Sequence, residues 1–320
     1  MINSQIQHLQ ESYIQYLEQN PFLGKPQNLY DPMNYILSLG GKRVRPLLSL
    51  IGNKSAKGDI SNALPIAHLV EVFHNFSLVH DDIMDNADVR RGKPTVHIKW
   101  DMPTAILSGD NLLVKTFEIW NKYSGPFKQE ILECYIQTAV DVCEGQQKDM
   151  DFATAEESIS ENAYLDMIRQ KTAVLLGAAL KMGFLSAGGD PLHSDTFYQF
   201  ALQTGMSFQM MDDYLDSFGS ESKTGKKQGG DIIEGKNTWL KIKSLEIDAI
   251  KTNALFSIQG ELRIEPVIQY WKEIGLDVGI QKLATTYHQQ SLKSLDQLKE
   301  WGYDVELLEA LSHWLLGRDN

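Results

Sequence analysis

Two acidic segments of one pattern are the residues most able to do chemistry in this chain. Residues 81–85 read DDIMD and residues 212–216 read DDYLD. In a helix, positions i, i+3 and i+4 lie on one face, so each segment presents several carboxylates to one side. Two such faces opposed across a cavity would bind hard cations, and those cations would bind a diphosphate.

The alternative interpretation is a pair of solvated acidic helix faces, which is what most charge clusters are. The flanking residues argue against it, because Leu78 and Val79 precede the first segment, and Met211 and Phe218 lie on either side of the second. Helices that are apolar on most sides are usually buried. In a partly buried site, two carboxylates about 4 Å apart repel by roughly 4 kcal/mol. We therefore expect a neutralising cation.

The residue types indicate which cation it is. Carboxylates without a Cys or His cluster suit Mg, with Mn possible, rather than zinc. A mixed transition-metal site of His80 and Asp81 is the alternative. Mg usually completes its coordination shell with waters and substrate phosphates. The acidic segments therefore predict a phosphate-bearing ligand, which also needs cationic side chains.

Three basic segments could supply those side chains. Residues 40–46 read GGKRVRP, residues 90–95 read RRGKPT, and residues 225–231 read GKKQGGD with Lys236 beyond them. Glycines let the backbone approach an anion closely, and arginines bind phosphate with two parallel hydrogen bonds. The first segment alone could be an ordinary solvated turn, and the arginines of the second could form only salt bridges with the nearby acidic segment. The third, with its glycines and lysines, predicts a flexible lid over residues 219–231.

Helical periodicity must position these segments, and it recurs along most of the chain. Strand-like alternation is scarce. We predict an all-α fold in which residues 1–320 form a single domain, a large helical bundle around a central cavity, with the acidic helices on opposite walls. The predicted helices cover residues 2–19, 30–39, 44–55, 61–85, 103–122, 127–152, 159–186, 193–218, 237–249, 265–273, 277–300 and 304–316.

Composition excludes several classes of protein. The 320 residues are 42% hydrophobic and 22% charged, which is ordinary for a globular protein. A net charge of −12 argues against a nucleic-acid binder and against an electrostatic membrane anchor. Two cysteines predict no disulfide framework and fit a cytoplasmic location. The N-terminus lacks a signal-peptide pattern, and the most apolar run, residues 173–180, is too short to span a membrane.

Taken together, these segments resemble the trans-prenyltransferases, also called the polyprenyl synthetase or isoprenyl diphosphate synthase family. The similarity runs from about residue 40 to residue 236. It includes both aspartate segments, GGKRVRP, RRGKPT, the Lys171–Thr172 pair and Gln209 ahead of the second segment. The ends of the chain carry only generic helical patterns. The joint signal is specific, although each basic segment alone is weak.

The resemblance implies a role for each matching residue. A cluster of Mg ions, about three with substrate bound, would be held by the aspartates and would bind the allylic diphosphate. The implied metal ligands are Asp81, Asp82, Asp85, Asp212, Asp213 and Asp216. The implied contacts of the allylic diphosphate are Arg90, Lys171, Thr172, Gln209, Lys226 and Lys236. The implied contacts of the isopentenyl diphosphate are Lys42, Arg45, His74 and Arg91. Among all of these, the residues expected to act in catalysis are Asp81, Asp82, Asp85, Asp212, Lys171 and Lys226.

The implied activity is the condensation of isopentenyl diphosphate with an allylic diphosphate (dimethylallyl, geranyl or farnesyl) to give an all-trans prenyl diphosphate. Product length in relatives depends on the residues just before the first aspartate segment. Here Phe76 is followed by the small Ser77, a pattern similar to short-chain synthases with products of about fifteen to twenty carbons. We lean to geranylgeranyl diphosphate, although Phe76 could instead be plain core. The resemblance also implies a homodimer.

Two other functions remain open at this point. A class I terpene cyclase shares the metal-driven ionisation, but it would usually lack the second aspartate segment and the Lys42–Arg45 pair. A non-catalytic subunit of a heteromeric prenyl synthase would be expected to lose motif aspartates, and this chain keeps them all.

Overall fold

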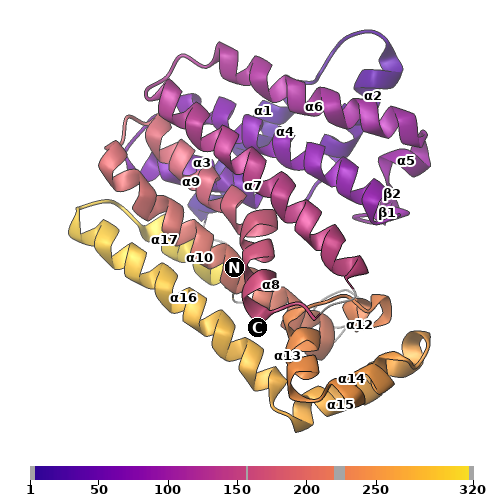
Figure 1. The fold of residues 1–320 in the computed structure, drawn as a ribbon. Coiled ribbons are helices and arrows are strands. Elements are labelled where there is room, and N and C mark those ends of the chain that lie inside the picture. Colours follow the sequence, from indigo (N-terminus) through magenta and orange to yellow (C-terminus); the bar gives the residue numbers. More distant parts are fainter. Residues whose placement is uncertain (1–3, 156–157, 220–227, 317–320) are drawn as a thin grey trace. The chain divides into compact units, whose positions relative to one another are not determined.

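The structure is a computed structural model that describes residues 4–155, 158–219 and 228–316, and nearly all of its regular elements are helices (Figure 1). The first half contains α1 (Ser4–Gln19), α2 (Gln27–Ser38), α3 (Val44–Ser55), α4 (Ile60–Met84), α5 (Val96–Lys99), α6 (Met102–Lys122) and α7 (Lys128–Thr154). The second half contains α8 (Glu161–Ile168), η1 (Arg169–Ala173), α9 (Val174–Ser186), α10 (Pro191–Phe218), α12 (Gly230–Glu234), α13 (Trp239–Ile247), α14 (Ala249–Phe256), η2 (Gly260–Arg263), α15 (Ile264–Glu273), α16 (Leu276–Glu300) and α17 (Glu306–Leu316). Among the described residues, the strands are β1 (Val89–Arg90) and β2 (Lys93–Pro94), which pair antiparallel.

The predicted all-α class is confirmed, and the long helices lie close to their predicted ranges. Residues 44–55 were predicted and observed as one helix, whereas the single helix predicted over residues 159–186 is divided into α8, the π-helical η1 and α9. The short α5, α12 and α14 were not predicted. Four to eight residues give too few apolar repeats for a periodic signal.

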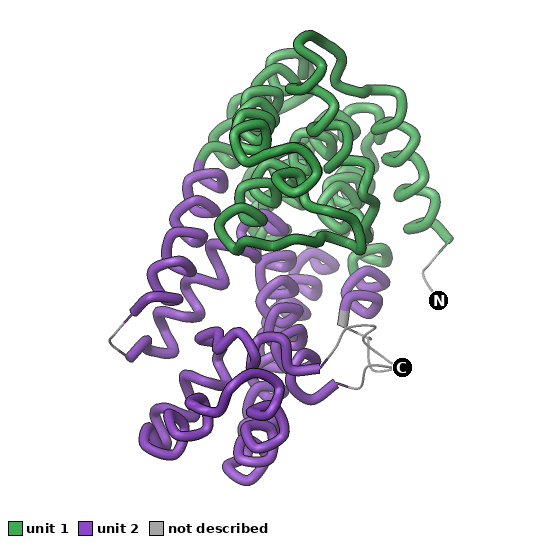
Figure 2. The backbone as a smooth tube through the Cα atoms, turned by 90° about the vertical axis from the view of Figure 1, so that its right-hand side faces the viewer, with its two compact units in different colours: residues 1–136, 178–198, 301–308 green, residues 137–177, 199–300, 309–320 purple. Residues whose placement is uncertain are grey.

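The chain divides into two compact units, shown in different colours in Figure 2. Unit 1 comprises residues 1–136, 178–198 and 301–308, and unit 2 comprises residues 137–177, 199–300 and 309–320. Four helices, α7, α9, α10 and α17, contribute residues to both units. The single domain, the central cavity and the opposed acidic walls stay predictions.

Unit 1 is built around α4, which contacts α1, α2, α3, α5 and α6. This helix is apolar on most sides, and Leu69, Val70 and Phe73 are fully buried. Asp59 caps its first turn by accepting a hydrogen bond from the Ser61 backbone N–H at 3.0 Å. Because α4 is packed on several sides, it is a rigid support for the polar residues it carries.

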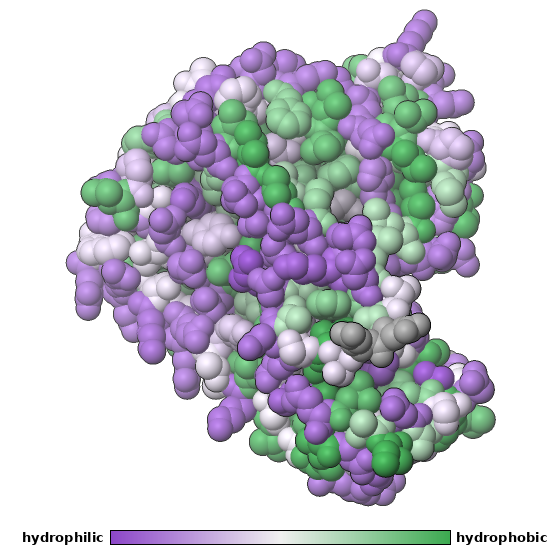
Figure 3. Space-filling model, viewed as in Figure 1, coloured by the Kyte–Doolittle hydropathy of each residue, from purple (hydrophilic) through white to green (hydrophobic). Residues whose placement is uncertain are grey.

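Unit 2 gathers α8, η1, α12–α16 and the parts of α7, α9, α10 and α17 that fall in it. The α13 helix contacts α8, α14 and α16, and Trp271 of α15 is 1% exposed. Hydrophobic side chains also lie on the surface of this unit near α14 and α15 (Figure 3), where Ile250 and Leu262 are exposed. In the part of the chain that the structure describes, no helix has the length and apolar character needed to cross a membrane.

Candidate active site

The first aspartate segment lies at the carboxyl end of α4, where a Schellman motif terminates the helix. Asn86 has a left-handed φ of 50°, and its N–H donates to the Ile83 carbonyl at 3.2 Å. The Ala87 N–H donates to the Asp82 carbonyl at 2.9 Å. Asparagine tolerates this conformation better than most residues, which explains why the helix ends here. The segment is thereby held on the final turn of a well-packed helix.

This position is electrostatically unfavourable for anions, because a helix carboxyl end carries partial negative charge. Asp82 is nonetheless 1% exposed. Arg90 compensates it, donating from Nε to Asp82 Oδ1 and Oδ2 at 2.8 and 2.9 Å and lying 3.6 Å from Asp81 Oδ2 through Nη2. Arg90, which was predicted to contact the allylic diphosphate, therefore forms ion pairs with two of the predicted metal ligands, Asp81 and Asp82.

The RRGKPT segment forms the β1–β2 hairpin, and its two-residue turn consists of Arg91 and Gly92. Both have positive φ, 53° and 73°, as a type I′ hairpin requires. The buried Thr95 secures the base of the hairpin, since its Oγ1 donates to the Ala87 carbonyl at 2.8 Å. The turn consequently aims Arg91 away from Arg90, although the two are adjacent in sequence.

Arg91 joins the hairpin to the GGKRVRP segment. Its Nη1 donates to the Gly40 carbonyl, and a Cβ added to Gly41 would lie 2.7 Å from the Arg91 Cζ. Gly41 also has a φ of 112°, so a side chain there would be both strained and in collision. Gly41 is needed because the Arg91 guanidinium occupies the space that a side chain would fill, whereas Gly40 has open space around it and is favoured only by its left-handed φ of 78°.

A cationic cluster of Arg45, His74 and Arg91 results. Arg45 Nη1 donates to His74 Nε2 at 3.1 Å. Because guanidinium groups only donate, His74 must accept at Nε2 and carry its proton on Nδ1. Burial, and then the nearby Arg45, hold the pKa of His74 well below its usual value, so the ring is neutral at pH 7. Burial lowers the pKa of Arg45 to about 10 and also lowers the pKa of Arg91.

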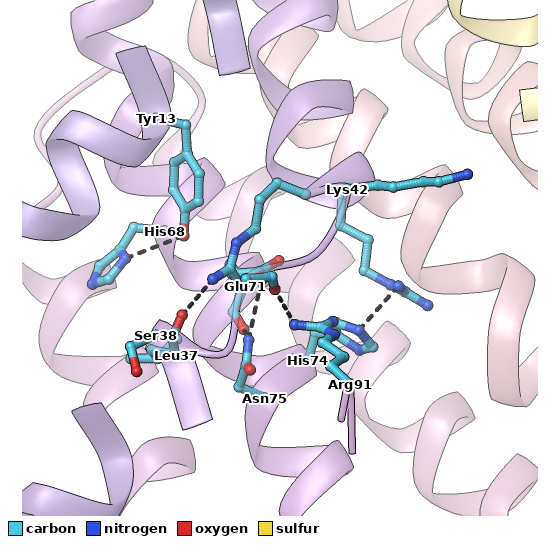
Figure 4. A network of polar contacts seen from close by, with 12 residues as sticks. Tyr13, Leu37, Ser38, Lys42, His68, Glu71, His74, Asn75 and Arg91 are labelled. Carbon is cyan, nitrogen blue, oxygen red and sulfur yellow. Dashed lines mark hydrogen bonds and ion pairs between the residues drawn. The ribbon is translucent and has the colours of Figure 1, made fainter. Parts of the chain in front are cut away.

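A buried ion pair lies next to this cluster (Figure 4). Arg43 and Glu71 are 7% and 1% exposed, and Arg43 Nη1 donates to Glu71 Oε1. Lys42, also predicted to bind a diphosphate, is exposed, and its side chain extends away from Glu71 in Figure 4. Unit 1 therefore brings together three of the four residues predicted for isopentenyl diphosphate, Arg45, His74 and Arg91, close to Asp82 of the first aspartate segment, and Lys42 directly precedes Arg43 in the chain.

The second aspartate segment lies in the last two turns of α10. Asp213 is 5% exposed, and its carboxylate accepts hydrogen bonds from Tyr164 Oη and, at 3.0 Å, from Gln209 Nε2. Burial raises the pKa of Asp213 to about 7, although the Tyr164 hydrogen bond lowers it, and Asp231 adds repulsion. A cation bound here would favour the charged carboxylate.

Asp216 is tied to the segment that follows α10. Its Oδ2 accepts from the Asp231 N–H at 3.0 Å, and Gly230 would bring a Cβ within 3.2 Å of Asp216 Oδ1. Lys236 Nζ lies 3.5 Å from Asp231 Oδ1 and 3.0 Å from Glu234 Oε2. Lys226 and most of the predicted lid, residues 220–227, lie outside the described residues.

Lys171 and Thr172 lie in η1, a π-helical segment of the kind often found at functional sites. Lys171 Nζ donates to Asp149 Oδ2 at 2.6 Å. A Cβ on Gly145 would lie 2.4 Å from the Lys171 backbone nitrogen, so Gly145 permits the close approach of α7 to η1. Lys171 is thus held within unit 2 by an acidic residue that sequence analysis did not select.

Phe76 is 9% exposed and packs in an aromatic cluster. The centroid of its ring lies 5.5 Å from that of the Phe73 ring and 4.9 Å from that of the His80 ring. Ser77 Oγ donates to the His74 carbonyl at 2.9 Å. The ring of His80 points to α6, because its Nε2 lies 3.2 Å from the Ile106 carbonyl oxygen. This orientation offers no support for a metal site shared by His80 and Asp81. The charged neighbour of the Asp81 carboxylate is Arg90.

The predicted site residues fall into two groups, one in each unit, and their opposition across a cavity stays a prediction. Among the described residues, no three acidic, His or Cys side chains converge closely enough to hold a metal ion by themselves. The carboxylates of the predicted metal ligands still fit Mg, which is usually bound by one or two carboxylates plus substrate phosphates rather than by protein side chains alone.

Sequence analysis missed Glu71, Tyr164 and Asp231. No spacing rule relates Tyr164 to Asp213, because 49 residues separate them. A signal for Glu71 did exist, since a carboxylate in the apolar stretch of residues 66–73 needs a cationic partner. Asp231 was within the third basic segment but was overlooked beside its lysines.

Comparisons with known proteins agree on one family. A sequence model of the polyprenyl synthetase family matches residues 26–265. The geranylgeranyl diphosphate synthase of Methanosarcina mazei is 35% identical over 299 residues, which cover 92% of this chain and 91% of that protein. The short chain isoprenyl diphosphate synthase of Methanocaldococcus jannaschii is 40% identical over 250 residues, which cover 78% and 76%. A crystal structure of a geranylgeranyl pyrophosphate synthase superimposes with a TM-score of 0.90 and 38% identity, over 99% of this chain and 98% of that one.

Proposed function

This chain belongs to the polyprenyl synthetase family, and we propose that it condenses isopentenyl diphosphate with an allylic diphosphate, releasing diphosphate and a prenyl diphosphate longer by one isoprene unit. Relatives named geranylgeranyl diphosphate synthases and short chain isoprenyl diphosphate synthases support this reaction. They also favour a product of about twenty carbons, as the Phe76–Ser77 pair does.

One observation supports the reaction most strongly: α4 carries parts of two different phosphate sites. His74 belongs to the cationic cluster, and Asp81 and Asp82 lie two turns further along the same helix. A cationic site binds a diphosphate directly, whereas an acidic site binds one through metal ions. A condensation of two diphosphates requires two adjacent sites of this kind.

The reaction begins when the allylic carbon–oxygen bond breaks. The electron pair leaves with the diphosphate, and the allylic carbon becomes a carbocation. Magnesium ions, when bound to the aspartates, would neutralise the departing diphosphate. Lys171, Lys226 and Lys236 would stabilise the same developing charge, and such electrostatic stabilisation often dominates catalysis.

The cationic cluster fixes the second substrate. Lys42, Arg45 and Arg91 would hold the isopentenyl diphosphate so that its double bond lies next to the carbocation. The electron pair of that double bond forms the new carbon–carbon bond, which leaves a carbocation on the isopentenyl unit. The carbon next to this cation then loses a proton to the departed diphosphate, and a double bond is restored. No protein nucleophile is needed in this sequence of steps. Water must be excluded, and the lid predicted over residues 219–231 would do so.

Several finer features belong to the same proposal. Mg (or Mn) would bind as about three ions once substrate is present. The protein would act as a homodimer, as the family resemblance implies. A cytoplasmic location fits the two free cysteines, Cys134 and Cys143.

The test is a product assay with Mg, isopentenyl diphosphate and each of three allylic primers, dimethylallyl, geranyl and farnesyl diphosphate. We expect elongation with every accepted primer, a common product of about twenty carbons by mass spectrometry, and no reaction after chelation of the metal. Controls omit either substrate. Consumption of farnesyl diphosphate alone to a hydrocarbon would indicate a cyclase instead, and activity only with an added partner protein would indicate a subunit of a heteromeric enzyme.

A further inference from the structure

Glu71 is a buried carboxylate to which the proposed reaction gives no role. It lies in the interior of α4, one turn before His74, and is 1% exposed. Asn75 Nδ2 donates to its backbone carbonyl at 2.8 Å and to its Oε1 at 3.2 Å (Figure 4). A buried carboxylate is retained only where it is paired, and Arg43 is its partner.

Arg43 connects three helices through its side chain and its position. Its Nη1 donates to Glu71 of α4, and its Nη2 donates to the Leu37 carbonyl in the last turn of α2. Its backbone is the N-cap of α3. A single guanidinium thus joins the carboxyl end of α2 to the middle of α4 at the point where α3 begins.

The backbone of Arg43 shows why this connection matters. Its φ of 51° is left-handed, a conformation that non-glycine residues adopt only where their surroundings hold them. The immediate neighbours of this turn are Lys42 and Arg45. The Lys42 carbonyl is fixed in addition by Gln10 Nε2 at 2.9 Å. The direction of both cationic side chains therefore depends on the turn that Arg43 maintains.

Glu71 also acts on the cluster electrostatically. Arg43, Arg45 and Arg91 lie close enough to oppose one another's charge, and Glu71 favours the charged form of both Arg45 and Arg91. Among the described residues, no acceptor reaches the buried Nε of Arg45. Its remaining hydrogen-bonding capacity suits an anionic ligand.

We propose that Glu71, acting through Arg43, is a positioning residue for the isopentenyl diphosphate site. It does not touch the substrate. It holds the Arg43 turn, which orients Lys42 and Arg45. Its negative charge also offsets the repulsion among Arg43, Arg45 and Arg91. This inference rests on the proposed function, because it assigns these cations to isopentenyl diphosphate.

The test variant is Glu71→Gln, which keeps the shape of the side chain and removes its charge. Arg43 then becomes a buried cation without a counter-charge, and the turn relaxes. We expect the KM for isopentenyl diphosphate to rise about tenfold or more, while the KM for the allylic substrate and kcat change less than about threefold. Calorimetric titration with isopentenyl diphosphate alone should show the same loss of affinity. Glu71→Asp, which keeps the charge, should lie between the wild type and Glu71→Gln.

A matched control separates positioning from general destabilisation. Asn53 is fully buried in α3, two turns beyond Arg45, and interacts with Ser186 rather than with the cluster. Asn53→Ala should lower the resistance to urea and leave both KM values unchanged. If Glu71→Gln does not fold, the double variant Arg43→Met/Glu71→Leu replaces both charges by apolar groups, which cores often tolerate. It should fold and still show the raised KM for isopentenyl diphosphate.

Two results would overturn the proposal. One is a KM for isopentenyl diphosphate within about twofold of wild type in Glu71→Gln or in the double variant. The other is an equal rise in both KM values, which indicates a merely structural role. Failure of the proposed function itself would look different, because the wild-type protein would then form no elongated product.

Discussion

Replacing Phe76 by alanine should lengthen the product. Phe76 is the buried aromatic residue five positions before Asp81, and its ring packs against Phe73 and His80. If the growing chain extends along α4 from the aspartate segment, this ring blocks its path. The substitution removes the block and leaves the Asp81 and Asp82 carboxylates in place.

The size of the effect follows from the group removed. The phenyl ring has about six carbons, and one further isoprene unit adds about five, so the space gained accommodates about one more unit. A product of about twenty carbons in the wild type would become one of about twenty-five in Phe76→Ala. Since Phe76 is 9% exposed, its truncation should cost about 3 kcal/mol of unfolding free energy, at the lower end of the range for core Phe→Ala changes.

The assay is mass spectrometry of the products formed from farnesyl and isopentenyl diphosphates, with urea unfolding measured on the same samples. Phe184→Ala is the matched control, because Phe184 is another buried aromatic residue of unit 1, with its ring stacked on that of Phe197 at a centroid distance of 4.1 Å. It should destabilise the protein to a similar extent without changing product length. An unchanged product from Phe76→Ala, or an equally long one from Phe184→Ala, would contradict a role for Phe76 in setting chain length.

Three further predictions concern the aspartates and a buried histidine. Asp82→Ala and Asp212→Ala should each lower kcat by orders of magnitude with unchanged helical circular dichroism, and a near-normal rate in either would refute the assigned metal ligands. Tyr164→Phe removes the hydroxyl bound to Asp213, so the Mg concentration for half-maximal activity should rise several-fold; an unchanged Mg titration would show that this hydrogen bond does not tune the carboxylate. Burial lowers the pKa of His68 from its ordinary value of 6.5 to about 4. The unfolded chain therefore binds this proton first as pH falls, so His68 alone should lower stability by roughly 3 kcal/mol between pH 6.5 and 4, measured from urea midpoints as the difference between the wild type and His68→Phe.

Local patterns along the chain were enough to predict most of the long helices and to propose the chemistry of the site. Apolar periodicity is a property of neighbouring residues, so α3 and α4 were predicted to within about one residue. The aspartate segments and the basic segments are also local patterns, and their residue types alone indicate a diphosphate bound through metal ions.

Which of these residues act together depends instead on how the helices pack. The pairing of Arg43 with Glu71 joins residues 28 apart, and that of Tyr164 with Asp213 joins residues 49 apart. The hairpin turn sends Arg90 to Asp82 and Arg91 to Gly40; the family resemblance assigned the two arginines to different diphosphates, but the sequence did not show which residues each would contact. Contacts between helices select such partners, and no spacing along the chain encodes them.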